Sequence, residues 1–487
     1  MSDNRREVTL DPEDWGGMKA LGHRMLDDLM EYLEDVRENP YRPPTEEARR
    51  RICVPLPREG DGGEEMYELF REHILPSTPI FVRPDFWSGV GGNGSPFGML
   101  TDMAISGVNT GSIFMFYITR QALDWVKELL EYPAEAGGVF VASGSEANFT
   151  GLAVARNAKA EVDMKTVGVQ GAPRMMTLYC SDEAHHCMDR SVELLGLGNE
   201  ALRWVETDDD CRMRLDALQA AIDEDRARGC HPFCVVGTAG TVNCGAFDDL
   251  NALADLCARE GLWFHVDGAF GSWVKISETH RHLADGLERA DSVAVDLHKW
   301  MSMPYGIGCT LVRDRLAHFS TFVYGHEAEY LKTGQEMSGD RVTNPMNLSL
   351  ALSRPDYGLK AYMLLRAYGR DRYARLIQQN IDQIAYLAER IRRAPDMEVT
   401  APVASNVLCF RYVREGLSEG ELEELNRAIL MELWEVNARM FNDTRIKGRH
   451  TLRLCNVNHR TRYSDFDLLA ERVSRIGGRL AQEYTAS

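Results

Sequence analysis

Short apolar runs alternate with loops and helical stretches between about residues 85 and 320, and this alternation constrains the fold more than any other feature of the chain. Strands that alternate with helices predict an α/β domain built on a largely parallel sheet. Loops at the carboxyl ends of such strands collect ligands, so motifs that directly follow the runs are expected to converge in space. The runs are Met175–Cys180, Phe233–Val236, Leu262–Val266 and Ser292–Val295.

The two ends of the chain follow other patterns. From Asp14 to Val36 apolar residues recur at steps of three and four, which predicts an amphipathic helix, and a second helix is expected to start at Thr45. After a helical stretch from Tyr357 to about Arg393, strand-like segments alternate with helices. These segments are Ala404–Tyr412, Glu419–Leu433, His450–Asn456 and Ser464–Glu483. We therefore expect a helical arm over 1–84, a large α/β domain over 85–370 and a smaller α+β domain over 371–487.

Composition narrows the class of protein. Lys and Arg total 55 against 74 Asp and Glu, so the net charge of −19 disfavours nucleic acid and anionic membranes as partners. The 11 cysteines form no Cys-x-x-Cys motif, which indicates reduced thiols and makes zinc, or any other metal, an unexpected ligand. No export signal or apolar run of membrane-spanning length is found, so we expect a cytoplasmic protein.

One turn has the residues of a phosphate site. Ser143-Gly144-Ser145 opens a helical stretch, where free N–H groups, hydroxyls and the positive end of the helix dipole suit a phosphate. The plainer interpretation is an ordinary serine N-cap.

A carboxylate and an amine follow two neighbouring runs. Asp267 leaves a buried strand beside small residues and could hold a pyridinium nitrogen protonated, or it could cap the next helix. Lys299 follows another buried strand between His298 and Trp300. Most lysines are solvated, but an enclosed amine here is expected to have a lowered pKa and to be fit for a Schiff base.

A histidine follows the first run. His185 could stack on a cofactor ring or move protons, and the alternative is an ordinary loop histidine. Taken singly, each motif has a structural explanation. Their joint occurrence in this order, with Lys299 coming 32 residues after Asp267, favours one shared site.

The chain resembles the group II pyridoxal-phosphate-dependent decarboxylases, the family of aromatic L-amino acid and glutamate decarboxylases. The similarity extends from Leu10 to Thr461, and the His-Lys-Trp and His-Val-Asp motifs are its most specific part. The residues that carry it are Ser143–Asn148, Ala184-His185, Gly237–Thr241, His265–Ala269 and His298-Lys299-Trp300.

The resemblance implies a fold-type-I large domain, a small C-terminal domain and an obligate homodimer wrapped by the N-terminal arm, with the active site at the subunit interface. It implies that Lys299 forms the Schiff base with pyridoxal 5'-phosphate, that Asp267 pairs with the ring nitrogen, and that His185 and Ala269 pack on opposite ring faces. The phosphate end would be held by Ser143, Gly144, Ser145, Asp296 and His298. Arg460 would meet a substrate carboxylate.

Two segments depart from the family pattern. The stretch Ser338–Met346 lacks the tyrosine that normally protonates the substrate carbon, so Tyr324, Tyr330 or His185 would have to replace it. In the family, loss of this acid goes with oxidative decarboxylation–deamination to an aldehyde. The segment Val108–Tyr117 is shorter than in aromatic-specific relatives, which leaves the pocket shape open.

The expected activity is decarboxylation of an L-amino acid to the amine and CO2, with an aromatic substrate slightly favoured. An aromatic slot would use Phe86, Trp87, Phe114 and Phe116, although such residues are more often core. The alternatives are an aldehyde synthase, a decarboxylase of acidic or polar amino acids and, least favoured, a non-catalytic binding protein on the same fold.

Overall fold

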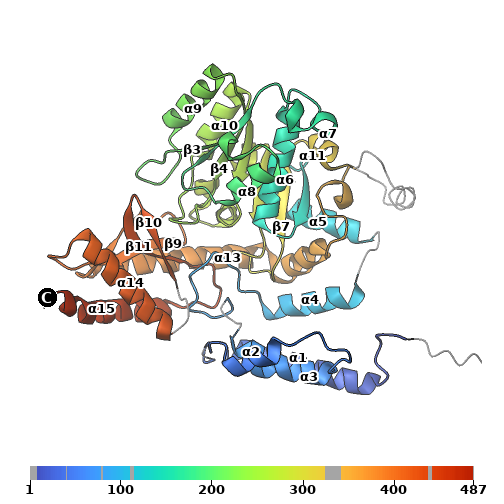
Figure 1. The fold of residues 1–487 in the computed structure, drawn as a ribbon, viewed down its shortest axis with the longest axis vertical. Coiled ribbons are helices and arrows are strands. Elements are labelled where there is room, and N and C mark those ends of the chain that lie inside the picture. The colour runs from blue at the N-terminus through green and yellow to red at the C-terminus, as the bar shows by residue number, and fades with distance from the viewer. Residues whose placement is uncertain are drawn as a thin grey trace, which may run out of the picture. The chain divides into compact units, whose positions relative to one another are not determined.

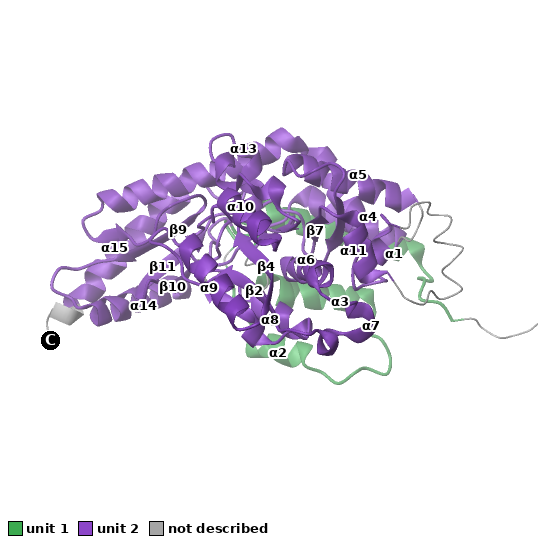
Figure 2. Cartoon of the chain, turned by 90° about the horizontal axis from the view of Figure 1, so that it is seen from above, with its two compact units in different colours: residues 1–83 green, residues 84–487 purple. Residues whose placement is uncertain are grey.

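The computed structural model describes residues 8–39, 41–77, 81–109, 114–323, 342–436 and 441–485. They belong to two compact units, one within residues 1–83 and one within 84–487 (Figure 2). The division of the second unit near residue 370 stays a prediction. Within the described ranges, no helix has the length and apolar character needed to cross a membrane.

The first unit is helical. The helix predicted from Asp14 is confirmed as α1 (Trp15–Glu34), and the Asp14 carboxylate caps it by accepting from Gly16 N. The helical start at Thr45 is confirmed as well, since its hydroxyl accepts from Ala48 N at 3.0 Å. No residue of α1 is buried. The remaining elements are α2 (Glu46–Ile52), α3 (Gly63–Leu69), the π-helical turn η1 (Phe70–Ile74) and the 3-10 turn η2 (Leu75–Ser77).

A seven-stranded sheet forms the centre of the second unit (Figure 1). The order β1-β7-β6-β5-β4-β2-β3 is parallel except for β7, which runs antiparallel to β1 and β6. The four predicted runs are β2, β4, β5 and β6, each within two residues of its predicted bounds. The strands are β1 (Gly137–Val141), β2 (Met176–Ser181), β3 (Leu202–Val205), β4 (His231–Thr238), β5 (Trp263–Asp267), β6 (Ser292–Asp296) and β7 (Gly308–Val312).

Helices cover both faces of this sheet, because alternate side chains of each buried strand point to opposite faces. Cys234 and Val236 of β4 pack in one apolar cluster with Leu152 of α6. Val235, between them, packs in another with Leu253 of α10. The first face carries α6 (Gly144–Lys159) and α8 (Cys187–Leu194), and the second carries α9 (Leu215–Ala227) and α10 (Leu250–Glu260). Further helices are α4 (Pro96–Val108), α5 (Phe114–Leu129), α7 (Met164–Val167) and α11 (Arg315–Phe322).

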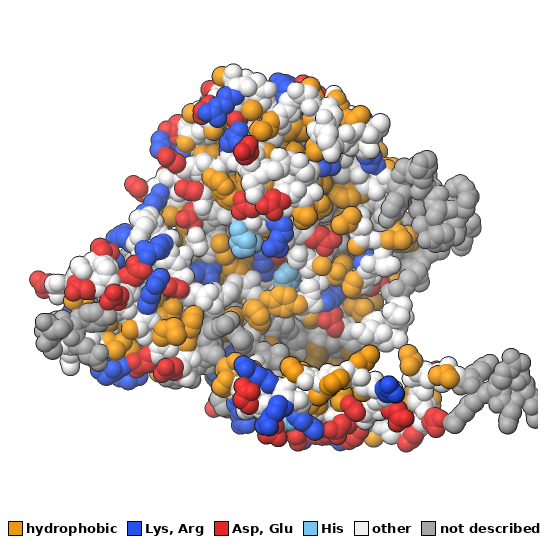
Figure 3. All heavy atoms as spheres, in the orientation of Figure 1, with side chains coloured by type: hydrophobic (Ala, Val, Ile, Leu, Met, Phe, Trp, Pro, Cys, Tyr) orange, Lys and Arg blue, Asp and Glu red, His pale blue; other side chains and the backbone are white. Residues whose placement is uncertain are grey.

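The predicted C-terminal α+β part is confirmed as a four-stranded antiparallel sheet of order β10-β11-β9-β8 with its own apolar core. The helical stretch after Tyr357 is interrupted at Gly369, whose φ of 72° suits a residue without a side chain. The elements are α13 (Tyr357–Arg393), β8 (Met397–Val399), β9 (Val407–Tyr412), α14 (Glu419–Val436), β10 (Asn442–Ile446), β11 (Arg449–Cys455) and α15 (Tyr463–Thr485). On the face shown in Figure 3, acidic and basic side chains are intermixed over this unit.

Candidate active site

A cavity of ≈ 190 Å³ lies where β2, β4, β5 and β6 end and α6 begins. The structure thus brings six of the predicted residues to one place, although the last follows the first by 155 positions in the chain. These six are Gly144, Ser145, His185, Asp267, Ala269 and Lys299. The cavity is also lined by Val90, Asn148, Cys187, Thr238, Gly240, Val242 and Phe270.

The turn before α6 caps the helix and also has the geometry of an anion-binding site. Ser143 Oγ accepts from Glu146 N, and the Glu146 carboxylate accepts from Ala142 N at 2.9 Å, which is a reciprocal cap. Gly144 is required here, because a Cβ on it would lie 2.5 Å from Asp296 Oδ2. Gly144 and Ser145 line the cavity, so the N-terminus of this 16-residue helix opens at it, which suits an anion such as phosphate.

Asp267 is the last residue of β5 and is 5% exposed. Its Oδ1 accepts from Ala269 N at 3.1 Å. The alternative role of helix cap is wrong, because the next helical turn, η5 (Gly271–Ile276), starts after Phe270 without a side-chain cap. Beside Asp267 in the sheet, Thr238 carries a buried hydroxyl that has no hydrogen-bond partner among the described residues. A carboxylate and an unpaired hydroxyl thus face one cavity.

Lys299 follows β6, and its Nζ lies 2.9 Å from Asp296 Oδ2. The expectation of a lowered pKa is wrong for this amine. Burial alone would lower the pKa of Lys299, but the negative charges of Asp296 and Asp267 outweigh burial and raise it. The amine is therefore protonated at neutral pH while it faces two carboxylates.

Asp296 and His298 adjoin the cavity without lining it. Asp296 pairs with Lys299, so we assign it as the counter-ion of that amine. The phosphate-binding role that the resemblance implies for Asp296 stays a prediction. His298 is fixed by its Nδ1, which lies 3.0 Å from Ile307 O, and burial lowers its pKa.

His185 is half-buried in the cavity wall, and a backbone contact sets its tautomer. The N–H of Cys187 donates to His185 Nδ1 at 3.1 Å, so the neutral ring carries its proton on Nε2. Burial is the main cause that lowers the pKa of His185, against an opposing effect of Asp267. The residue is therefore neutral near pH 7, with Nε2–H as its donor.

A buried chain of hydrogen bonds supports this wall and was missed by the sequence reasoning. Trp263 Nε1 donates to Ser292 Oγ at 2.8 Å, which leaves the hydroxyl to donate to His265 Nδ1 at 2.7 Å. His265 Nε2 then donates to Asn148 Oδ1 at 2.9 Å. Burial lowers the pKa of His265 to about 4, so the ring stays neutral. The signal was the spacing of two between His265 and Asp267, which puts both on the α6 face of β5.

The predicted substrate residues do not line the described cavity. The expectation that Trp87 lines the substrate slot is wrong, because its large apolar ring is fully buried in the C-terminal core. There it stacks on Phe466 at 4.8 Å between ring centroids, and its Nε1 donates to Thr461 Oγ1. Phe86 is half-buried, and Phe114 is 65% exposed at the start of α5. Arg460 donates to Asn93 O at 3.1 Å. Tyr324, Tyr330 and most of the 338–346 stretch lie outside the described residues.

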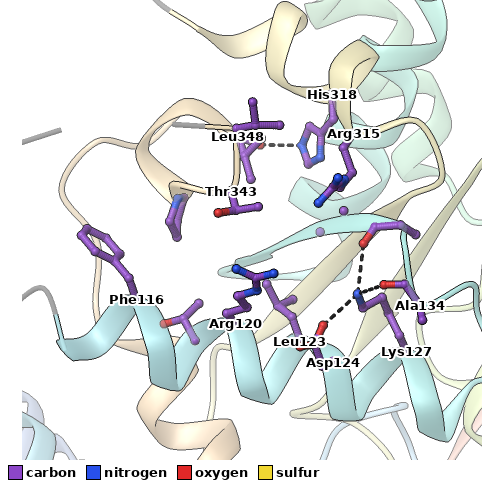
Figure 4. Close-up of a pocket in the computed structure, with 16 residues that line it drawn as sticks. Phe116, Arg120, Leu123, Asp124, Lys127, Ala134, Arg315, His318, Thr343 and Leu348 are labelled. Carbon is purple, nitrogen blue, oxygen red and sulfur yellow. Dashed lines mark hydrogen bonds and ion pairs between the residues drawn. The ribbon is translucent and has the colours of Figure 1, made fainter. Parts of the chain in front are cut away.

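A second pocket, of ≈ 70 Å³, lies at the opposite end of β1 (Figure 4). Its amine, Lys127, is already bound by Asp124 at 2.8 Å and by two backbone carbonyls, those of Ala134 and Ala136. None of the predicted site residues except Phe116 contributes to it. We therefore place the candidate active site in the ≈ 190 Å³ cavity that Lys299 and Asp267 line, and not in this pocket.

Comparison with known proteins gives a consistent result. Residues 57–413 match the family model described as the pyridoxal-dependent decarboxylase conserved domain. An aromatic-L-amino-acid decarboxylase of Bacillus atrophaeus is 29% identical over 96% of this chain and 97% of its own. A phenylacetaldehyde synthase of Arabidopsis thaliana is 26% identical over 93% and 94%.

The fold is also shared with solved structures. The crystal structure of Oryza sativa TDC with PLP and tryptamine superimposes with a TM-score of 0.89 at 23% identity, covering 97% of this chain and 100% of that one. At this identity the likeness shows the fold, and it confirms the predicted fold-type-I architecture.

Proposed function

The chain belongs to the pyridoxal-dependent decarboxylase family and is a pyridoxal-phosphate-dependent amino acid carboxy-lyase, and we propose that it converts an aromatic L-amino acid to its amine and CO2. The single observation that carries the site assignment is one cavity lined by both Lys299 and Asp267.

The residues present fit the cofactor. Pyridoxal phosphate has an aldehyde, a ring nitrogen and a phosphate, and the cavity offers an amine, a carboxylate and a helix N-terminus. The unpaired Thr238 hydroxyl is a buried polar atom that needs such a partner. When bound, the cofactor supplies the electron sink for breaking the bond between Cα and the carboxylate.

The chain's own groups then have distinct roles. Lys299 supplies the amine that holds the aldehyde, and the Asp267 carboxylate keeps the ring nitrogen protonated. The N–H groups at Gly144 and Ser145 bind the phosphate. His185, with its proton on Nε2, returns a proton to the substrate Cα after CO2 leaves.

The substrate proposal rests on the described walls of the cavity. Val90, Val242 and Phe270 are apolar, and Lys299 is the one cation among the described lining residues. An acidic side chain would require a second cation to offset its desolvation, whereas an aromatic one would not. CO2 release from a panel of aromatic, acidic and small polar amino acids tests this. Faster turnover of an acidic substrate would overturn the aromatic assignment.

The assembly we propose is a homodimer with the active site at the subunit interface. This is supported by α1, which has an apolar stripe but no buried residue, with Trp15 57% and Met18 46% exposed. Such a face is covered in most folded proteins. Sedimentation of the purified protein tests the dimer, and a monomer that is fully active would contradict it.

An aldehyde synthase is the second candidate. It is favoured by the absence of tyrosine from Ser338–Met346 and by the similarity to phenylacetaldehyde synthase. That reaction consumes oxygen and releases ammonia and hydrogen peroxide with the CO2, whereas simple decarboxylation releases neither. Quantifying all three products from one incubation separates the two.

A further inference from the structure

One arginine of the C-terminal sheet joins two wall segments of the cavity, and we propose that Arg453 is a positioning residue that sets the substrate-binding space between them. Arg453 lies in β11 and is 5% exposed. Its Nη1 donates to Ser88 O at 2.7 Å, and its Nη2 donates to Val242 O at 2.6 Å. This inference rests on the proposed function, since it assigns the space beside these walls to the amino acid substrate.

Both acceptors belong to segments that contribute a residue to the cavity wall. Val242 lines the cavity itself, and Ser88 stands two residues before Val90, which lines it too. The two segments are far apart in the chain and neither is a strand or helix. A single rigid guanidinium therefore fixes their separation, since its N–H groups point in set directions.

Other contacts fasten each segment to the same sheet separately. The Ser88 hydroxyl donates to Asn442 Oδ1 at 2.7 Å. On the other segment, Asn243 O accepts from Cys409 Sγ at 3.3 Å, and Asn243 Oδ1 accepts from Thr444 Oγ1 at 3.1 Å. The C-terminal sheet is thus the support for this side of the cavity, and Arg453 is the side chain that bonds to both segments at once.

Arg453 is a buried cation without a counter-ion among the described residues, which indicates that it has a role other than stabilising the fold. Within the described ranges it pairs with no carboxylate, and its buried Nε has no partner. Arg411, on the neighbouring strand β9, is 6% exposed but forms ion pairs with Glu398 at 2.6 Å and Glu419 at 2.7 Å. A buried cation without a counter-ion costs folding free energy, so an apolar side chain would be the more stable choice at 453.

The side of the cavity that we assign to the cofactor and the side that we assign to the substrate are supported by different elements. A change at Arg453 should therefore affect the substrate side and not the cofactor side. The proposed cofactor groups lie on α6, on β5 and on the loops after β2, β5 and β6, whereas the segments of Val90 and Val242 are joined to each other through Arg453. Loss of the guanidinium leaves Ser88 O with only the longer bond from Asn442 Nδ2 at 3.4 Å and removes the Arg453 bond to the partly buried Val242 O, so the two wall segments are no longer joined to each other. We therefore expect weaker substrate binding with the cofactor retained.

The test compares holoenzymes of Arg453→Met, Arg453→Lys and the matched control Arg411→Met. The readouts are the visible absorbance of bound cofactor, the melting temperature, and kcat and KM for CO2 release with the best amino acid of the panel. For Arg453→Met we expect KM to rise by about tenfold with a smaller change in kcat and unchanged absorbance. Arg453→Lys keeps the positive charge and an ammonium donor, so its KM should lie between those of Arg453→Met and the wild type. Arg411→Met should lower the melting temperature and leave KM unchanged.

A second route covers the case in which Arg453→Met does not fold. Val242→Ala trims the wall, and a double-mutant cycle with Arg453→Lys should show effects on KM that are not additive, because both changes act on one wall. Additive effects, a wild-type KM in Arg453→Met, or an equal rise in Arg411→Met would overturn the positioning role alone. A wild-type protein that releases CO2 from no amino acid would overturn the proposed function together with this inference.

Discussion

Lys299 and Asp296 form an ion pair of 2.9 Å at the end of β6, three residues apart, with Asp296 almost wholly buried. The same carboxylate lies close to Gly144 at the start of α6, since a Cβ on that glycine would be 2.5 Å from Asp296 Oδ2. One carboxylate thus lies beside both the proposed Schiff-base lysine and the first residue of the helix that we assign to the phosphate.

The assignment of Lys299 is tested by removing its amine. Lys299→Ala should purify without the visible absorbance of a lysine-bound cofactor, because no other amine lines the described cavity. Lys165→Ala, on the surface, should keep the absorbance. If Lys299→Ala still absorbs in the visible range after dialysis, the lysine is misassigned.

The loading of cofactor should depend on pH. The pKa of Lys299 is raised, since Asp296 and Asp267 outweigh burial, and only the neutral amine attacks an aldehyde. Loading of the apoenzyme should therefore accelerate by about tenfold per pH unit between about pH 6 and pH 9. Asp296→Asn removes the strongest cause that raises the pKa and should speed loading at neutral pH. Stopped-flow absorbance measures both rates, and slower loading of Asp296→Asn would contradict the assigned counter-ion role.

His185 should govern which product forms. His185→Phe keeps a flat ring but loses the Nε2 donor, so amine formation should fall by about 100-fold. Ammonia and peroxide per CO2 should rise, because the unprotonated carbon stays exposed to oxygen. His185→Gln keeps a donor in its side-chain amide, so its rate of amine formation and its product ratio should lie between those of His185→Phe and the wild type. An unchanged product ratio in His185→Phe would show that another group is the acid.

The turn before α6 should tolerate no side chain. A Cβ at Gly144 would lie 2.5 Å from Asp296 Oδ2, and that carboxylate is held by Lys299 and cannot turn aside cheaply. Gly144→Ala should therefore weaken cofactor binding by about tenfold or more. The control is Gly22→Ala in α1, where a Cβ would meet nothing within 4 Å. This substitution should leave cofactor affinity unchanged and should be neutral or slightly stabilising for the fold. Cofactor titration measures both, and equal affinities would contradict the crowded turn.

Local patterns were read correctly from the sequence because the interactions behind them are local. The runs of β2, β4, β5 and β6, the cap at Ser143 and the helix at Trp15 depend on residues within a few positions of each other. The resemblance to a family added the cofactor, which such patterns alone left open.

What the sequence determined by itself is therefore the set of segments and the residues that can carry chemistry, since side-chain periodicity and caps fix these over short distances. Only the tertiary structure decided the charge of Lys299, the core position of Trp87 and the bond from Arg453 to Val242. Each depends on burial or on groups brought together from distant positions, and burial and long-range charge are properties of the packed chain.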